Sequence, residues 1–133
     1  DGVVVSYRDS SYLRLAKFDS DGAIQFQKRY QHIGIVDGSE TGNMDVDSSN
    51  NIYVAASQSS PRAASITKFN SSGVIQWARY VYSNKSNQGW CCAVSSNGSN
   101  VYVGGQSDHT SNRASGDSTD SQMIKYNSSG TLQ

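Results

Sequence analysis

A short phrase that occurs three times is the strongest constraint on how this 133-residue chain folds. It reads KFDSDG at residues 17–22, KFNSSG at 68–73 and KYNSSG at 125–130, so its copies start 51 and then 57 residues apart. A second phrase alternates with it, as DVDSSNNIYV at 45–54 and AVSSNGSNVYV at 93–103. Self-similarity near 50 residues indicates one supersecondary unit that repeats and packs against its neighbours.

Each unit is predicted to contain four short antiparallel strands. Apolar positions do not follow a helical period, and the runs are rich in β-branched and aromatic residues. Clusters of Ser, Asn and Gly separate the runs, and these residues favour tight turns. In the complete copy, strands are expected at residues 43–47, 52–57, 66–70 and 74–81.

The apolar run IYVAA at residues 52–56 predicts a sheet that is buried on both faces. Four-stranded antiparallel units buried in this way are propeller blades. The expected fold is therefore all-β, a partial β-propeller made of four-stranded antiparallel blades. Residues 1–31 form a partial blade with the second to fourth strands, residues 42–81 a complete blade, and residues 90–133 a blade truncated in its last strand.

The two ends of the chain fall within units. The segment Asp1–Val5 matches Asn51–Ala55, and Gln133 stands where earlier copies continue to Phe26 and Trp77. We therefore expect a fragment of a longer repeat protein. Further blades of the same chain, or copies of itself, are expected as partners that cover the end faces.

Charge and hydropathy exclude some classes of partner. The chain has 11 basic and 11 acidic residues, a formal net charge of zero, and only 17% charged residues. The chain has no excess of basic residues, so a surface that binds nucleic acid or an anionic membrane is not expected. No apolar run approaches the length of a membrane helix, so membrane insertion is not expected.

Alternating strand direction places the repeated turns at one end of each unit and the remaining connections at the other. Those connections differ in length and content, at residues 8–11, 31–41, 58–65, 82–89 and 107–121. Diversity at one end favours recognition there. The alternative is that these loops are simply unconstrained.

The longest of these loops, residues 107–121, holds the best candidate site. Five of its side chains can hold a cation or bind sugar hydroxyls: Asp108, His109, Arg113, Asp117 and Asp120. The competing interpretation is a mobile polar loop with no site, because it has no hydrophobic anchor.

Two tryptophans receive different predictions. Trp90 stands where Gly42 stands in the preceding unit, at the boundary between loop and strand, and is a candidate for ligand stacking or for blade packing. Trp77 replaces Phe26 at the same position of a fourth strand, which favours packing.

The two cysteines are adjacent. Neighbouring Cα atoms lie about 3.8 Å apart, short of the usual disulfide span. Cys92 takes the place of Met44 in the repeat, so it is predicted to be a small core residue. A strained disulfide between Cys91 and Cys92 remains an alternative.

The sequence offers little material for catalysis. Glu40 is the only glutamate, and His32 and His109 lie in different loops. Asp45 and Asp47 lack the ligand pattern of a calcium loop, so a turn or strand role is predicted for them. We expect no catalytic residue, no metal site and no cofactor.

Residues 46–54, followed by TKFNSSGVIQW within residues 66–77, resemble the bacterial and phage-type β-propeller repeat family. The arrangement is also similar to NHL-type blades. The resemblance covers nearly the whole chain as about two and a half blades, and it implies that the first strand of each blade is innermost.

Repeats of this kind look like those of secreted bacterial surface proteins and of bacteriophage virion proteins. The resemblance implies a non-catalytic structural or adhesive segment of an extracellular or virion-surface protein. Such a segment would bind protein or glycan through its variable loops. The alternatives are part of a propeller enzyme of the glycan hydrolase or lyase type, or a small oligomeric propeller lectin.

Overall fold

The computed structural model describes residues 2–9, 12–31, 44–59, 62–82, 87–108 and 119–133. These residues form ten strands and no helix. The strands are β1 (Val3–Asp9), β2 (Tyr12–Phe18), β3 (Ile24–Gln31), β4 (Met44–Val46), β5 (Ile52–Ser59), β6 (Arg62–Phe69), β7 (Ile75–Tyr82), β8 (Asn87–Val94), β9 (Asn100–Asp108) and β10 (Thr119–Asn127). The predicted all-β character is confirmed.

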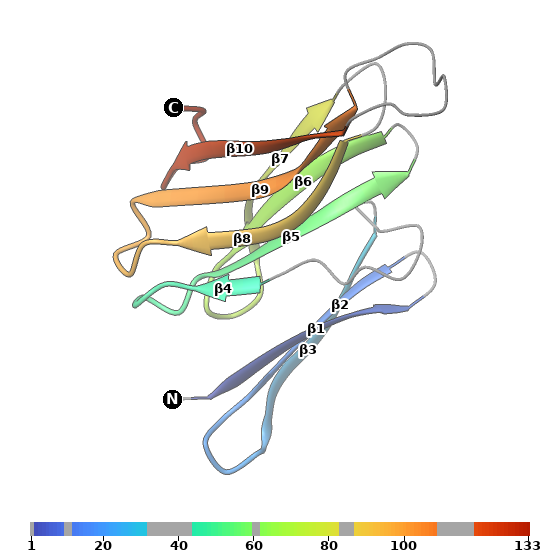
Figure 1. Ribbon diagram of the computed structural model, residues 1–133. Helices are drawn as coiled ribbons and strands as arrows, with labels where there is room; N and C mark the ends of the chain where they lie inside the picture. The colour runs from blue at the N-terminus through green and yellow to red at the C-terminus, as the bar shows by residue number, and fades with distance from the viewer. Residues whose placement is uncertain (1, 10–11, 32–43, 60–61, 83–86, 109–118) are drawn as a thin grey trace.

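The strands form three antiparallel sheets, each made of strands consecutive in the chain. The first sheet has the order β1-β2-β3, the middle sheet β4-β5-β6-β7, and the third sheet β10-β9-β8. Figure 1 shows the middle sheet lying between the other two in an open stack. The four strands predicted within residues 43–81 are present near their expected places, as β4 to β7.

The strands extend further toward the variable connections than predicted. β5 continues to Ser59 and β6 starts at Arg62, so most of the expected loop at residues 58–65 is a paired hairpin. β9 likewise reaches Asp108 and β10 starts at Thr119. The physical reason is that backbone hydrogen bonds hold an antiparallel ladder, and polar residues make them as well as apolar ones.

The hairpin between β6 and β7 shows how the repeated phrase shapes a turn. The amide of Gly73 donates to the carbonyl oxygen of Asn70 at 2.9 Å. The Asn70 side-chain oxygen accepts from the amides of Ser72 at 3.0 Å and Val74 at 2.9 Å. Gly73 has a φ of 69°, which glycine adopts without a steric penalty.

The other two copies of the phrase make the same turn. Asp19 and Asn127 accept the equivalent pairs of backbone amides. Gly22 and Gly130 also have positive φ angles, of 81° and 77°. An Asn or Asp that begins the turn and a Gly that ends it therefore specify this hairpin locally.

The face of the middle sheet toward the first sheet carries a buried apolar cluster. Ile52 and Val54 of β5 and Phe69 of β6 pack with Leu15 of β2. The ring of Tyr30 lies 4.8 Å from that of Phe69, centroid to centroid. Side chains from two sheets thus form one core layer.

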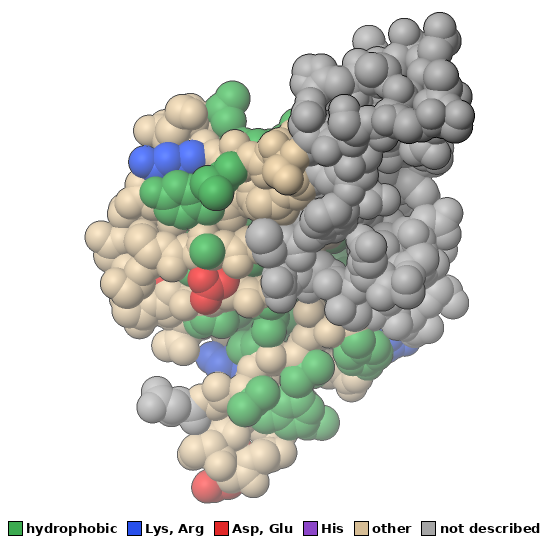
Figure 2. All heavy atoms as spheres, viewed as in Figure 1, with side chains coloured by type: hydrophobic (Ala, Val, Ile, Leu, Met, Phe, Trp, Pro, Cys, Tyr) green, Lys and Arg blue, Asp and Glu red, His purple; other side chains and the backbone are tan. Residues whose placement is uncertain are grey.

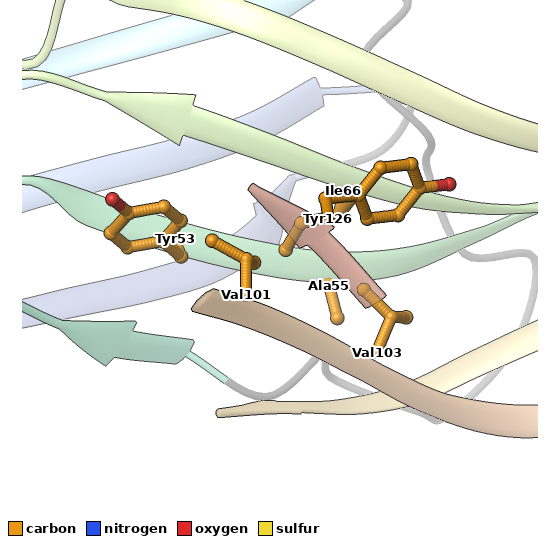
Figure 3. Packing of buried hydrophobic residues seen from close by; sticks show 6 residues of the cluster. All are labelled: Tyr53, Ala55, Ile66, Val101, Val103 and Tyr126. Carbon is orange, nitrogen blue, oxygen red and sulfur yellow. The ribbon is translucent and has the colours of Figure 1, made fainter. Parts of the chain in front are cut away.

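The opposite face of the middle sheet packs on the third sheet. Tyr53, Ala55 and Ile66 meet Val101, Val103 and Tyr126, which Figure 3 shows gathered between the strands. All five residues from Ile52 to Ala56 are buried. The prediction that this run is buried on both faces of its sheet is confirmed.

Candidate functional site

The interface between the first and middle sheets is closed by side chains of β3 that cover a turn. The ring of Phe26 lies over Gly73, where an added Cβ would come within 2.8 Å of it. The hydroxyl of Tyr30 donates to the carbonyl oxygen of Gly73, and Lys28 donates to that of Ser72 at 2.6 Å. The turn between β6 and β7 is therefore held by the last strand of the preceding sheet.

The interface between the middle and third sheets is closed in the same manner. The indole of Trp77 covers Gly130 and donates to the carbonyl oxygen of Ser128 at 3.0 Å. Arg79 donates to the carbonyl oxygen of Gly130 at 2.5 Å. The predicted packing role of Trp77 is confirmed.

We call this arrangement the turn clasp: on the last strand of one sheet, an aromatic residue covers the turn glycine of the next sheet, and a cation two positions later donates to a backbone carbonyl oxygen of that turn. Trp77 and Arg79 follow Phe26 and Lys28 by 51 residues, and their strand pairings are equivalent. Aromatic rings and charge-assisted hydrogen bonds to carbonyls are strong contributors at such contacts. The repeat therefore extends from local turns to sheet packing.

Two tyrosines at these interfaces have pKa values above the ordinary value. Burial raises the pKa of Tyr30 to about 12. Burial also raises the pKa of Tyr126, against the opposing effect of the positive charge on Arg79. A raised tyrosine pKa favours the hydroxyl as a hydrogen-bond donor, as seen between Tyr30 and Gly73.

Asp47 is the centre of a buried polar network at the turn between β4 and β5. Its carboxylate accepts from the amides of Ser49 and Asn51, each at 2.9 Å, and from the Asn51 side chain at 2.8 Å. The hydroxyl of Tyr53 donates to it at 3.0 Å. These contacts confirm the predicted turn role of Asp47.

The pKa values of this network follow from burial and hydrogen bonding. Burial alone would raise the pKa of Asp47, but hydrogen bonds from Asn51, Tyr53 and Ser49 bring it below its ordinary value. Burial, the hydrogen bond to Asp47 and its negative charge all raise the pKa of Tyr53. The pair is therefore a carboxylate that accepts from a neutral phenol.

Cys92 packs against the core between the middle and third sheets. Its sulfur lies 3.5 Å from the carbonyl oxygen of Tyr53. The prediction of a small core residue is thus confirmed. Within the described residues, no three His, Cys, Asp or Glu side chains are grouped so that they could hold a metal ion.

Only part of the predicted polar site falls within the described residues. His109, Arg113 and Asp117 lie outside the described residues. Asp108 is the last residue of β9, and Asp120 is the second residue of β10. Their backbones pair with Thr119 and Ser107, so both aspartates are at the same end of one hairpin. The prediction that Asp108 and Asp120 lie in a loop is wrong, because the ladder continues through them.

Trp90 is also placed differently from the prediction. It lies inside β8, which begins at Asn87, and not at the boundary between loop and strand. The register shifts between Gly89 and Cys91, so Trp90 is the extra residue of a β-bulge. Bulges re-aim the side chains of a strand, and sequence alternation alone does not show them.

The turn clasp is the structural feature that sequence reasoning missed. The signal was present: Phe26 and Lys28 correspond to Trp77 and Arg79 at the same spacing. What the sequence does not show is that these side chains contact the next unit and not their own. That contact requires the relative placement of two sheets.

The described residues contain no helix long and apolar enough to cross a membrane. No family model matches the chain, and no curated protein matches it. Function is therefore inferred from the geometry of the sheets and turns.

Proposed function

We propose that this chain is a non-catalytic structural or adhesive segment of a β-propeller, in which each sheet is a blade. The observation that carries the proposal is the middle sheet, which is buried on both faces and joined to each neighbour through the same turn clasp. Repeated sheets that each cover the next are typical of propellers. The extracellular space or a virion surface is the proposed location.

Recognition is proposed at the end of the stack that carries the variable connections. The opposite end carries the repeated turns, and Figure 1 shows these turns together on one side. They are also tied to one another, since the amide of Ser48 donates to the carbonyl oxygen of Ser96 at 2.7 Å. At the other end of the stack, the connections differ in sequence from sheet to sheet, as loops that recognise ligands commonly do. Its proposed ligand is a glycan or a surface protein.

A glycan array and a pull-down against cell-surface or virion proteins test this role with the 133-residue chain. Replacement of residues 109–118 by a Gly/Ser segment of equal length is expected to abolish binding and leave the thermal midpoint unchanged. Ser71→Ala, an exposed position in a turn at the opposite end, is the matched control and is expected to bind normally.

The same preparation is assayed for release of reducing or unsaturated sugars from polysaccharides. Turnover above that of a heat-denatured sample would favour the propeller-enzyme alternative and contradict a non-catalytic role. Binding that is lost equally in the Ser71→Ala control would contradict recognition at the variable end.

A further inference from the structure

A second contact between the middle and third sheets, separate from the turn clasp, is made by a glycine in the turn between β8 and β9. A Cβ added at Gly98 would come within 2.5 Å of the carboxylate of Asp47 and 3.1 Å of the hydroxyl of Tyr53. Gly98 is buried, although it lies in a turn. We call Asp47 and Tyr53 the carboxylate–phenol pair. The pair approaches the third sheet so closely that this position has no room for a side chain.

The backbone of this turn does not itself require glycine. Gly98 has a φ of 68°, and its amide donates to the carbonyl oxygen of Ser95 at 2.7 Å. Asn50 holds the same place in the turn between β4 and β5, with a φ of 61° and an amide that donates to the carbonyl oxygen of Asp47 at 2.9 Å. The side chain of Asn50 is exposed. Asparagine tolerates this left-handed conformation, so the neighbouring sheet accounts for the glycine at position 98.

The atoms of the carboxylate–phenol pair are held in place by their surroundings. Asp47 is 5% exposed, and its carboxylate accepts hydrogen bonds from Ser49, Asn51 and Tyr53. Tyr53 is fully buried, and its ring lies edge-on to that of Trp77 with the centroids 6.2 Å apart. Moving either side chain would break hydrogen bonds of buried groups, which is costly. The pair therefore does not yield to a side chain added against it.

The turn between β8 and β9 is also fastened to the middle sheet at two further points. The carboxylate of Asp45, on β4, accepts a hydrogen bond from the amide of Val94 at 2.7 Å. The amide of Ser48 donates to the carbonyl oxygen of Ser96, also at 2.7 Å. Figure 2 shows acidic side-chain atoms at the surface over β4, next to β8. A shift of the turn away from the middle sheet would therefore strain both hydrogen bonds.

Among the three sheets, the carboxylate–phenol pair belongs to the middle sheet alone. Tyr53 lies opposite the lysine of the repeated phrase, and Val4 and Tyr102 hold that place in the first and third sheets. Val4 has no hydroxyl, and the third sheet has Ser95 at the turn position of Asp47. The middle sheet is thus the one that requires a glycine in the turn packed against it.

We propose that the carboxylate–phenol pair selects which sheet packs against the middle sheet, namely one whose turn has glycine at the position of Gly98. A turn like that of the middle sheet itself is excluded, because the side chain of Asn50 would collide with the pair. Sheets built from similar repeats are prone to pack in the wrong order, and specificity often comes from an element that penalises the wrong neighbour. The proposal rests on the sheet stacking of the proposed function and involves no ligand.

Urea denaturation of Gly98→Asn, compared with Gly22→Asn, tests the steric contribution. Both glycines have positive φ angles, but a Cβ added at Gly22 would meet nothing within 4 Å. Gly98→Asn is expected to raise the equilibrium constant for unfolding at least about tenfold more than Gly22→Asn does. Equal effects of the two substitutions would overturn the proposal, because the pair would then make room for a side chain.

A second background shows whether the carboxylate–phenol pair is the cause. Asp47→Ser installs the residue that the third sheet has at this turn position, and Tyr53→Phe removes the hydroxyl that Gly98 approaches. In the chain that carries both changes, the effect of Gly98→Asn on the unfolding constant is expected to be at least about fivefold smaller than in the wild type. An undiminished effect in this background would show that the pair does not select the neighbour.

Hydrogen exchange followed by NMR locates the loss of stability. The amides of Val94 and Ser48 donate between the two sheets, so they report on this joint directly. Gly98→Asn is expected to lower their protection at least about tenfold, and Gly22→Asn is expected to leave it unchanged. Faster exchange confined to the turn at residues 95–99 would contradict selection by the neighbouring sheet.

The smaller change Gly98→Ala is expected to show all of these effects more weakly, and it takes the place of Gly98→Asn if the asparagine variant does not fold. A chain that gives the expected results but binds no glycan or surface protein would count against the adhesive role only.

Discussion

At the scale of single residues, the buried polar side chains Asp47 and Thr67 differ in whether their hydrogen bonds are made. The carboxylate of Asp47 accepts hydrogen bonds from three neighbouring residues while it is almost completely buried. Thr67 is equally buried, and its hydroxyl has no hydrogen-bond partner among the described residues. Burial of a polar group stabilises the fold only when its hydrogen bonds are made.

Asp47 is expected to make the free energy of unfolding depend on pH. Its folded pKa is below that of the unfolded chain, so its contribution is present above about pH 4 and is lost as pH falls through the folded pKa. Asp47→Asn should lower the free energy of unfolding by about 1–3 kcal/mol at pH 7, measured by urea denaturation. The difference between the two proteins should shrink at pH 3. An equal difference at both pH values would contradict this assignment.

Thr67→Val is expected to stabilise the protein. Valine has nearly the same shape, and the change removes a hydroxyl that burial leaves without a partner. We expect the free energy of unfolding to rise by about 1 kcal/mol. Ser65→Ala on the same strand is the matched control, because the Ser65 hydroxyl donates to the carbonyl oxygen of Ala56 at 3.1 Å. It should lower stability, and a loss of stability in both variants would show that the Thr67 hydroxyl is satisfied.

At the scale of elements, each hairpin turn has a local part and a long-range part. The Asn or Asp that starts a turn and the Gly that ends it are read directly from the repeated phrase. The aromatic ring over the glycine comes from another sheet. Turn type was therefore predictable from sequence, and the turn clasp was not.

Substitution of the turn glycines separates these two parts. Gly22→Ala should lower the free energy of unfolding by about 1–2 kcal/mol, which is the cost of the left-handed backbone alone, because nothing lies near the added Cβ. Gly73→Ala and Gly130→Ala also force Cβ against Phe26 and Trp77, which should add about 1–3 kcal/mol. Urea denaturation measures the difference. Equal losses of stability in all three variants would show that the rings of Phe26 and Trp77 move aside at no cost in free energy.

At the scale of the whole molecule, burial is concentrated in the middle sheet. Residues Ile52–Ala56 lie between two other sheets, whereas Val3 and Met123 lie on outer faces. Elements with few buried apolar contacts open more readily than those in a core. Stability is therefore expected to be uneven across the stack.

Hydrogen exchange followed by mass spectrometry measures this unevenness. The amides of β5 and β6 are expected to exchange most slowly, and those of β1 faster by orders of magnitude. Uniform protection across all three sheets at low concentration would contradict a stack with one fully covered layer.

Local sequence patterns predict most of the strands, the turns and the two-sided burial of residues 52–56, because these depend on side-chain alternation and on Asn, Asp and Gly acting within a few residues. They also placed Trp77 and Cys92 correctly in the packing. The three-dimensional packing was needed to show where β9 ends and β10 begins, that Trp90 lies in a bulge, and which ring covers which turn. Those features depend on pairing and packing between residues distant in the chain, which local patterns do not encode.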